Sequence, residues 1–292
     1  MVSLPVTVVV PTIGRPRLLT ACLASIAACE PTPGQVAVVD QSGSAEVAGV
    51  VEAAGATLVS CPGRGAARAI NVGLRAARHH IVLVTNDDCT VARDWVNRAW
   101  AHSQEHPGNV ITGQVRPGGG DADAVPSVNV DPTPREYVGE PVYWALYGGN
   151  MVLPRDPVLA IGGFDERDCL LLAAEDNDLC YRWTKAGYAL RYRPDLVVWH
   201  HDWRSPEELY ARYVEYGRGQ GAFYAKHLRS GDLQALRFLA RDLRSGLRGT
   251  AAGIVRRRLP STDPRRGLLR GLPGGLARGW LEDRRIGRTM PC

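Results

Sequence analysis

Residues 81–88 read Ile-Val-Leu-Val-Thr-Asn-Asp-Asp, an apolar run that ends on an acidic turn. The apolar part predicts a buried strand, and a strand without polar alternation is typical of a parallel sheet covered on both faces. Asp87 and Asp88 are adjacent carboxylates that repel each other, and a divalent cation would relieve that repulsion. Asn and Asp also favour ordinary turns, so the cluster by itself leaves both interpretations open.

The residues before this stretch alternate between strand-like and helix-like patterns. We expect strands at 6–10, 36–40 and 57–60 and helices at 18–29, 44–54 and 66–78. Such rapid alternation predicts an α/β fold, a Rossmann-like and mostly parallel sheet flanked by helices. The length of 292 residues allows one large domain, or one domain with a modest appendage.

Three loops follow predicted strands and carry polar residues, at 11–15, 40–43 and 86–88. Ligands of open parallel sheets lie at the carboxyl ends of the strands. We therefore expect these loops to line one ligand site.

The second half of the chain lacks the regular alternation of strands and helices. Residues 116–141 are rich in Gly, Pro and Asp and predict a loop or hairpin excursion. After it we expect strands at 150–153, 189–192 and 196–199 and helices at 156–161, 174–186 and 206–228.

Three further groups in this half could carry chemistry. Glu175-Asp176-Asn177-Asp178 opens a predicted helix, where acidic residues favour the helix dipole. The cluster is also set against apolar residues, which can raise a carboxyl pKa enough for a general base. His200-His201 follows a predicted strand and offers a further metal ligand. The aromatic residues Tyr143, Trp144 and Trp203 suit a carbohydrate or flat acceptor.

The net charge of +5 is unevenly distributed. Residues 226–292 hold 16 Lys and Arg against 5 Asp and Glu, whereas residues 1–225 hold 19 against 25. Within the basic part, an apolar stripe at 3-4 spacing is interleaved with arginines, which predicts a basic amphipathic helix. The stripe is Leu233, Leu236, Ala240, Leu243 and Leu247, and the arginines are Arg237, Arg241, Arg244 and Arg248.

This helical extension has three interpretations. Its stripe could pack against the catalytic domain, or it could bind an anionic membrane surface. Nucleic-acid binding is disfavoured because only Phe238 and Trp280 could stack on bases.

The sequence favours a cytoplasmic protein, with the inner face of the membrane as a peripheral location. No apolar run reaches the roughly 20 residues of a membrane span. Residues 1–5 lack the basic start of a signal peptide. The seven cysteines are scattered without a CxxC pair, which favours free thiols in a reducing compartment.

Taken in order, the motifs of residues 6–225 resemble those of the family-2 glycosyltransferases, which have the GT-A fold. Those motifs are Val10-Pro11-Thr12 with Arg15, Val38-Val39-Asp40, the segment 63–74, Asn86-Asp87-Asp88 as a DxD variant, Gly148–Met151, Gly162–Glu166, Glu175–Leu179 with Arg182, and Pro194–His200. The resemblance implies a catalytic domain at 1–225, with a nucleotide-sugar-binding half at 1–115 and an acceptor-binding half at 116–225. Residues 226–292 would be the basic helical extension.

The resemblance also implies roles for single residues in an inverting transfer that depends on Mn²⁺ or Mg²⁺. Asp88 would coordinate the metal at the donor diphosphate, and His200 would be the distal ligand, with His201 as the alternative. Asp176 would be the general base, with Glu175 beside it. The implied donor-binding residues are Pro11, Thr12, Arg15, Asp40, Gln41, Arg64, Asn71, Asp87 and Asn150.

Two positions depart from the family pattern. Asn86 is a neutral residue at the first position of the DxD. Gln41 stands where many members have a second Asp that reads the base, and an amide both donates and accepts. The expected partners are therefore a nucleotide-diphosphate sugar, whose base the sequence does not specify, and a small-molecule, glycan or lipid-linked acceptor.

Two other functions compete. A sugar-nucleotide-processing nucleotidyltransferase usually has a Gly-rich phosphate loop with Arg and Lys after its first strand, and residues 11–15 hold one glycine. A non-catalytic sugar-binding protein of the same fold would have no need of Asp88, Asp176 and His200.

Overall fold

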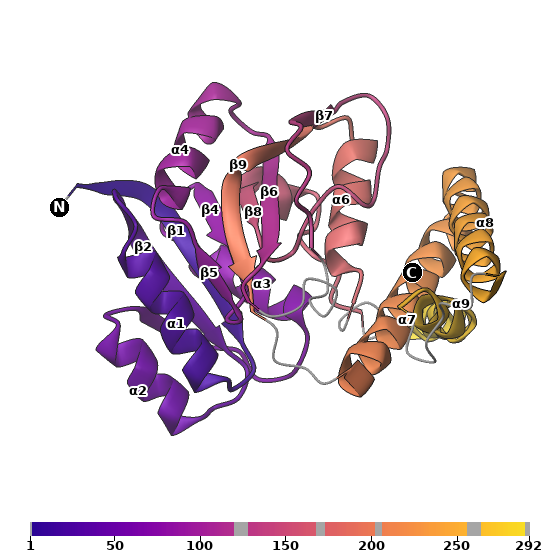
Figure 1. The fold of residues 1–292 in the computed structure, drawn as a ribbon, viewed down its shortest axis with the longest axis horizontal. Helices are drawn as coiled ribbons and strands as arrows, with labels where there is room; N and C mark the ends of the chain where they lie inside the picture. Colours follow the sequence, from indigo (N-terminus) through magenta and orange to yellow (C-terminus); the bar gives the residue numbers. More distant parts are fainter. Residues whose placement is uncertain (1, 120–127, 168–172, 202–205, 256–263, 290–292) are drawn as a thin grey trace. The chain divides into compact units, whose positions relative to one another are not determined.

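The computed structural model describes residues 2–119, 128–167, 173–201, 206–255 and 264–289 (Figure 1). The chain divides into two compact units. The first is Met1–Asp165 with Asp176–Asp202, and the second is Glu166–Glu175 with Trp203–Cys292. This boundary lies about one helix before the 225/226 boundary that the sequence suggests, so the functional division at that point stays a prediction.

The first unit begins with the expected alternation of strands and helices. Its elements are β1 (Ser3–Thr12), α1 (Pro16–Ala27), β2 (Thr32–Asp40), α2 (Ala45–Ala53), β3 (Thr57–Ser60), α3 (Ala66–Ala76) and β4 (Ile81–Val84). They agree with the predicted ranges to within a few residues, except that β1 and β2 start earlier.

The rest of the unit is less regular. Its elements are β5 (Cys89–Val91), α4 (Trp95–Glu105), β6 (Val110–Pro117), β7 (Arg135–Tyr137), β8 (Met151–Pro154), α5 (Arg155–Ala160), α6 (Glu175–Lys185) and β9 (Leu190–His200). The sequence predicts two short strands where β9 is one. Its pairing with β6 jumps from Gly113–Arg193 to Gln114–Val197, so the intervening residues form a bulge around Pro194. A bulge explains the broken pattern, because proline cannot donate to a ladder.

Among the described residues the strands form one nine-stranded sheet in the order β3-β2-β1-β4-β8-β6-β9-β5, with β7 paired to β9. The strands β3, β2, β1 and β4 run parallel to one another, and β6 and β9 are also parallel. The strand β8 runs antiparallel to both of its neighbours, β4 and β6. This mixed α/β sheet flanked by helices confirms the predicted fold class.

Alternate residues of β1 pack under different helices. Val6, Val8 and Val10 are fully buried in a core that includes Leu19 of α1 and Trp95 of α4. Val9 faces α3 instead, where a Cβ added to Gly73 would overlap it. The period of two along a strand therefore places helices on both sheet faces, and Gly73 permits the close approach of α3.

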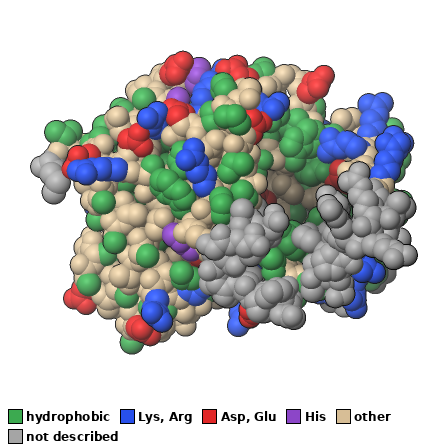
Figure 2. Space-filling model, viewed as in Figure 1, with side chains coloured by type: hydrophobic (Ala, Val, Ile, Leu, Met, Phe, Trp, Pro, Cys, Tyr) green, Lys and Arg blue, Asp and Glu red, His purple; other side chains and the backbone are tan. Residues whose placement is uncertain are grey.

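The second unit is helical in its described part, with α7 (Pro206–Arg229), α8 (Leu233–Val255) and α9 (Pro264–Thr289). The sequence predicts α7 and α8 but not α9. Glycines at 217 and 221 of α7 meet the backbone of α9, and Gly271 and Gly275 of α9 meet that of α7, so tightly that an added Cβ would overlap a carbonyl. In Figure 2, Lys and Arg side chains gather over these C-terminal helices. Among the helices that the structure describes, none is long and apolar enough to cross a bilayer.

Candidate active site

The predicted ligand loops leave the sheet at neighbouring strand ends. Thr12, the last residue of β1, is in register with Asp40, the last residue of β2, and Asp40 is in register with Ser60 of β3. On the other side of β1, β4 runs directly into the acidic turn. The loops at 11–15, 40–43 and 86–88 therefore meet at one edge of the sheet.

The acidic turn is held by Arg15. Asp87 is fully buried, and its carboxylate accepts hydrogen bonds from Thr12 Oγ1 at 2.7 Å, from Arg15 Nε at 3.1 Å and from Arg15 Nη2. Arg15 Nη1 also donates to Asp88 Oδ2 at 2.8 Å. Burial raises the pKa of the Asp87 carboxyl, although the Arg15 charge opposes this shift. One guanidinium thus offsets the repulsion between the two adjacent carboxylates.

Asp88 also faces His200, which ends β9. Asp88 Oδ1 lies 3.4 Å from His200 Nε2, and one ligand atom each from Asp88, Cys89 and His200 lie within 4.8 Å of one another. Two atoms bound at right angles to Mg²⁺ would be about 3 Å apart, close to the 3.4 Å between Asp88 Oδ1 and His200 Nε2. His200 Nδ1 is buried and has no hydrogen-bond partner among the described residues. His200 Nε2, the other ring nitrogen, is the one that faces Asp88 Oδ1, and an imidazole nitrogen beside a carboxylate oxygen is a ligand set that divalent metals accept, so the residues fit a metal.

The neighbouring groups decide which residues of this cluster suit a hard cation. Burial raises the pKa of the Cys89 thiol well above its usual value, and the Asp88 charge adds to the shift, which favours the neutral thiol. His201 points elsewhere, since its Nε2 lies 2.9 Å from Thr90 Oγ1 and its ring lies against Gly118. Of the two histidines, His200 therefore has the geometry of a ligand.

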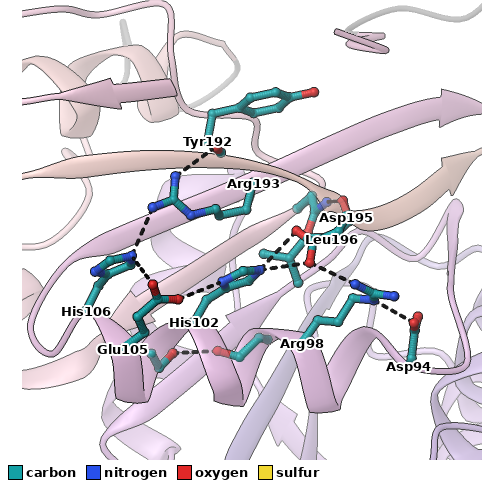
Figure 3. Close-up of polar contacts among 12 residues, drawn as sticks. Asp94, Arg98, His102, Glu105, His106, Tyr192, Arg193, Asp195 and Leu196 are labelled. Atoms are coloured by element: carbon teal, nitrogen blue, oxygen red, sulfur yellow. Dashed lines mark hydrogen bonds and ion pairs between the residues drawn. The ribbon is translucent and has the colours of Figure 1, made fainter. Parts of the chain in front are cut away.

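The strand that carries His200 is fastened to α4 (Figure 3). Asp195, in the bulge of β9, accepts hydrogen bonds from Arg98 Nη1 at 2.8 Å and pairs with His102 Nε2 at 2.9 Å. Burial raises the pKa of the Asp195 carboxyl, but the hydrogen bonds to Arg98 and His102 outweigh burial and lower it. The network fixes the bulge five residues before His200.

The second acidic cluster separates into two kinds of carboxylate. Asp178 is fully buried and accepts from Arg182 Nε at 2.7 Å, while the same arginine donates to the carbonyls of Ile161 and Gly163. Asp176 is only partly buried, and it accepts from the backbone N–H groups of Gly148 at 3.2 Å and Asn177 at 2.8 Å. Asp178 therefore anchors α6, whereas Asp176 points toward the Gly148 loop.

The Gly148-Gly149 dipeptide joins the two acidic clusters. A Cβ added to Gly148 would lie 3.3 Å from Asp176 Oδ2. A Cβ added to Gly149 would lie 3.4 Å from Cys89 Sγ and 3.6 Å from Asn86 Nδ2. Because consecutive Cα atoms are about 3.8 Å apart, Asp176 and the acidic turn flank the same short backbone segment. Thr85 Oγ1 holds that segment by donating to Gly149 O at 2.9 Å.

The loop after β2 is locked by its own side chains. Asp40 accepts from Ser42 N and Ser42 Oγ at 2.8 and 2.6 Å and from Gly43 N at 3.0 Å. Gln41 Nε2 donates to the carbonyls of Gly63 and Gly65 at 2.8 and 3.2 Å. The loops after β2 and β3 are thereby joined, with Arg64 exposed between the two glycines and Pro11 half-buried nearby on β1.

Asn71 and Asn150, two of the predicted donor contacts, make hydrogen bonds within the fold. Asn71 Nδ2 donates to Phe164 O at 2.8 Å, and its Oδ1 accepts from Phe164 N at 2.9 Å. Asn150 is fully buried, accepts from Trp95 Nε1 and donates to the carbonyls of Gln114 and Leu196. These bonds hold segments of the fold in place, and the donor contact expected of both residues stays a prediction.

Two of the three predicted acceptor residues, Tyr143 and Trp144, lie within the described residues. Tyr143 is buried and lies edge-on to the half-exposed Trp144, with ring centroids 5.2 Å apart. Trp203 lies outside the described residues, and Glu175 belongs to the second compact unit. Their roles stay predictions.

Residues 4–222 match the family described as "Glycosyltransferase like family 2". The chain belongs to this family. The resemblance noted in the sequence is therefore confirmed, and with it the enzyme class, glycosyltransferase.

Solved structures with the same fold are distant in sequence. Mannosyltransferase PcManGT from Pyrobaculum calidifontis, in complex with GDP-Man and Mn²⁺, is 22% identical with a TM-score of 0.62, and the match covers 99% of this chain and 84% of that one. S. aureus TarS 1–349 is 18% identical with a TM-score of 0.54, covering 74% of this chain but only 65% of TarS 1–349. The same TarS fragment in complex with UDP-GlcNAc is 16% identical with a TM-score of 0.53, covering 97% and 92%. No curated protein matches the chain.

Sequence reasoning missed the structural use of two residues in this family-2 glycosyltransferase. Arg15 was expected at the donor, but its contacts are with Asp87 and Asp88. Cys89 was not singled out, although it directly follows the acidic turn and lies beside the ligand atoms of Asp88 and His200. The adjacency of Cys89 was visible in the sequence, whereas the Arg15 contact, across more than 70 residues, was not.

Proposed function

We propose that the enzyme transfers a sugar from a nucleotide-diphosphate donor to an acceptor hydroxyl with inversion at the anomeric carbon. The observation that supports this most strongly is the Gly148-Gly149 dipeptide, which has Asp176 on one side and the acidic turn on the other. A displacement reaction needs a base for the incoming hydroxyl and a charged site for the leaving diphosphate within one sugar's reach. The two acidic clusters meet that demand.

Asp88 and His200 are the residues that would hold a divalent cation, Mn²⁺ or Mg²⁺. PcManGT, which has the same fold and was solved with GDP-Man and Mn²⁺, supports this choice. When bound, the cation supplies positive charge against the charge that develops on the leaving diphosphate. The Asp88 oxygen that does not bind Arg15 faces His200, so Arg15 and a cation could use the same carboxylate together.

The donor would lie along the loops that leave β1, β2 and β3. Thr12 and Arg15 shape the β1 side through Asp87, and Asp40 and Gln41 shape the β2 side. Pro11 and Arg64 complete this edge, and Arg64 is exposed to meet a phosphate or ribose. Asp87, with its oxygens bound to Arg15 and Thr12, would act on the donor through Arg15.

Asp176 would perform the proton transfer. As the acceptor oxygen forms its bond to the anomeric carbon, Asp176 takes the hydroxyl proton, and the bond from that carbon to the diphosphate oxygen breaks. The electron pair of that bond leaves on the nucleoside diphosphate. A base on the face opposite the leaving group gives inversion in one step. Glu175, the residue before it, is the alternative base.

A donor panel tests the proposal. Purified enzyme with Mn²⁺ is given UDP-, GDP- and dTDP-sugars, and release of nucleoside diphosphate is followed with and without EDTA. We expect metal-dependent turnover of one donor class, and a product of opposite anomeric configuration by NMR. Release of pyrophosphate from a sugar phosphate and a nucleoside triphosphate would instead show a nucleotidyltransferase. Binding without turnover of any donor, across acceptors, would show a non-catalytic sugar-binding protein.

We also propose that the enzyme works in the cytoplasm and meets a lipid-linked acceptor at the inner face of the membrane. The basic charge of residues 226–292 supports this location.

A further inference from the structure

The described part of α8 exposes the apolar stripe that its spacing would normally bury. Leu233, Leu236 and Leu247 are 72%, 50% and 62% exposed, Ala240 is exposed as well, and Leu243 is partly buried. Three leucines on one stripe of one helix are more than scattered surface residues, because they form a continuous apolar strip.

The opposite side of α8 is the one that packs. Ala235 is fully buried and Phe238 is 6% exposed. Asp242 accepts a hydrogen bond from Tyr224 of α7 at 2.5 Å, and Gly246 lies against Leu269 of α9. The leucine stripe is therefore not needed to hold α8 in its own unit.

Four arginines run beside the exposed stripe. Arg237, Arg241, Arg244 and Arg248 are all exposed. Each directly follows a stripe residue, so the two stripes are about 100° apart around the helix. Asp242 is the sole acidic residue between positions 233 and 248, and its carboxylate accepts from Tyr224 Oη and pairs with Arg241 Nε. The outer face of α8 thus combines an apolar stripe with four arginines against one carboxylate.

We propose that this face of α8, residues 233–248, is a docking surface for a bilayer that contains anionic phospholipid. The leucines insert among the acyl chains while the arginines contact the phosphate headgroups, as in interfacial amphipathic helices. This inference deepens the proposed membrane location and names the residues that produce it.

Two other occupants fit less well. Nucleic acid would use the arginines but gives the leucines nothing to contact, and the aromatic residue of this segment, Phe238, is buried. A second copy of the chain would bury the leucines but would bring two arginine stripes together, with Asp242 as the one carboxylate of residues 233–248 against four arginines in each copy.

The test is vesicle co-sedimentation of the full chain with phosphatidylglycerol-containing and with pure phosphatidylcholine vesicles. The charge variant is Arg237→Glu/Arg244→Glu, and its control is Arg78→Glu/Arg93→Glu, which changes the net charge equally at exposed positions of the first unit. The apolar variant is Leu236→Ser/Leu247→Ser, and its control is Leu58→Ser/Val138→Ser, which removes exposed apolar side chains elsewhere.

We expect binding to the anionic vesicles alone. Each arginine near such a surface contributes about five-fold in partitioning, so the charge variant should bind at least about 25-fold more weakly. The apolar variant should lose about ten-fold or more. Both controls should bind as the unchanged chain does.

Three results would overturn the inference: no binding to anionic vesicles, equal losses in the controls, or displacement of the vesicles by a short RNA. Sedimentation equilibrium gives a fourth, a dimer that the apolar variant converts to monomer. Donor hydrolysis without vesicles is measured on the same variants and should be unchanged. The failure of membrane docking is thus distinguishable from failure of the proposed transfer.

Discussion

The two acidic clusters, 86–88 and 175–178, look alike in sequence and share one structural feature. Each contains a fully buried aspartate that is paired with an arginine, Asp87 with Arg15 and Asp178 with Arg182. They differ in the neighbouring carboxylate. Asp88 is buried beside His200, whereas Asp176 is partly exposed and bound by backbone N–H groups.

This difference indicates which carboxylate suits a metal and which suits proton transfer. A buried carboxylate beside a histidine suits a cation, and a partly exposed carboxylate on a loop suits proton transfer to an arriving substrate. Asp87 and Asp178 are fully buried and paired with arginines, and in our proposal neither of them is the metal ligand or the base.

The largest expected effect comes from Asp176→Asn. The amide keeps the size of the side chain but cannot accept the acceptor proton, so kcat should fall by about 10²–10⁴-fold. Thermal unfolding of the variant should stay near that of the unchanged enzyme, since Asp176 is not fully buried. The measurement is steady-state transfer with the donor identified by the panel. A variant with normal kcat would remove Asp176 from the mechanism and point to Glu175, tested as Glu175→Gln.

The corresponding substitution in the ion pair of Asp178 and Arg182 is Arg182→Met. It leaves Asp178 buried without its partner and frees the carbonyls of Ile161 and Gly163. Loss of one member of a buried ion pair costs about 3–5 kcal/mol, so the free energy of unfolding should fall by that amount. Urea denaturation measures it. If stability were unchanged while kcat fell, Arg182 would belong to the chemistry and the contrast between the two aspartates would fail.

The Gly148-Gly149 segment gives a smaller, paired test. A methyl group at Gly148 lies 3.3 Å from Asp176 Oδ2, which is tight, whereas a methyl at Gly149 makes ordinary contacts. Displacing a catalytic group by a few tenths of an ångström should lower kcat by about ten-fold in Gly148→Ala. Gly149→Ala should retain near-normal kcat. Equal effects at the two positions would show that the segment acts through its flexibility and not through Asp176.

The smallest expected effect concerns Asp195, far from both clusters. Its pKa is lowered in the folded state, so it stabilises the fold above its unfolded pKa of about 3.9, and this contribution is lost as the pH falls through the lower folded pKa. Asp195→Asn should therefore be less stable at pH 7, and the difference should shrink as the pH falls below about 3.9. Because the group is partly exposed, the effect should stay below about 1 kcal/mol. Urea titrations at both pH values measure it, and a constant difference would contradict the cited hydrogen bonds.

The fold could be predicted from the sequence more completely than the site could. The strands within residues 6–84 were recognisable because buried parallel strands are apolar throughout, and the acidic turn was recognisable because it directly follows one of them. Helix α9 was missed because its signal is a glycine every four residues, at 267, 271, 275 and 279, and not an apolar stripe. The bulge of β9 split one strand into two apparent ones.

The ion pairs of Arg15 could not be predicted, because Arg15 and the aspartates of the acidic turn are more than 70 residues apart and only the folded sheet brings them together. For the same reason Asn71 and Asn150 resembled ligand contacts in the sequence, although their partners are groups far along the chain. The stripe of α8 shows the reverse case. Its spacing is typical of a packed face, yet Leu233, Leu236 and Leu247 are exposed.

The central claim is that Asp88 serves the donor and Asp176 the acceptor. It is tested most directly by titrating the nucleoside diphosphate identified by the donor panel, with Mn²⁺, into the unchanged enzyme, Asp88→Asn and Asp176→Asn in a calorimeter. We predict equal Kd values for the unchanged enzyme and Asp176→Asn, and a Kd at least about 100-fold weaker for Asp88→Asn. Normal binding by Asp88→Asn, or loss of binding by Asp176→Asn, would contradict the account.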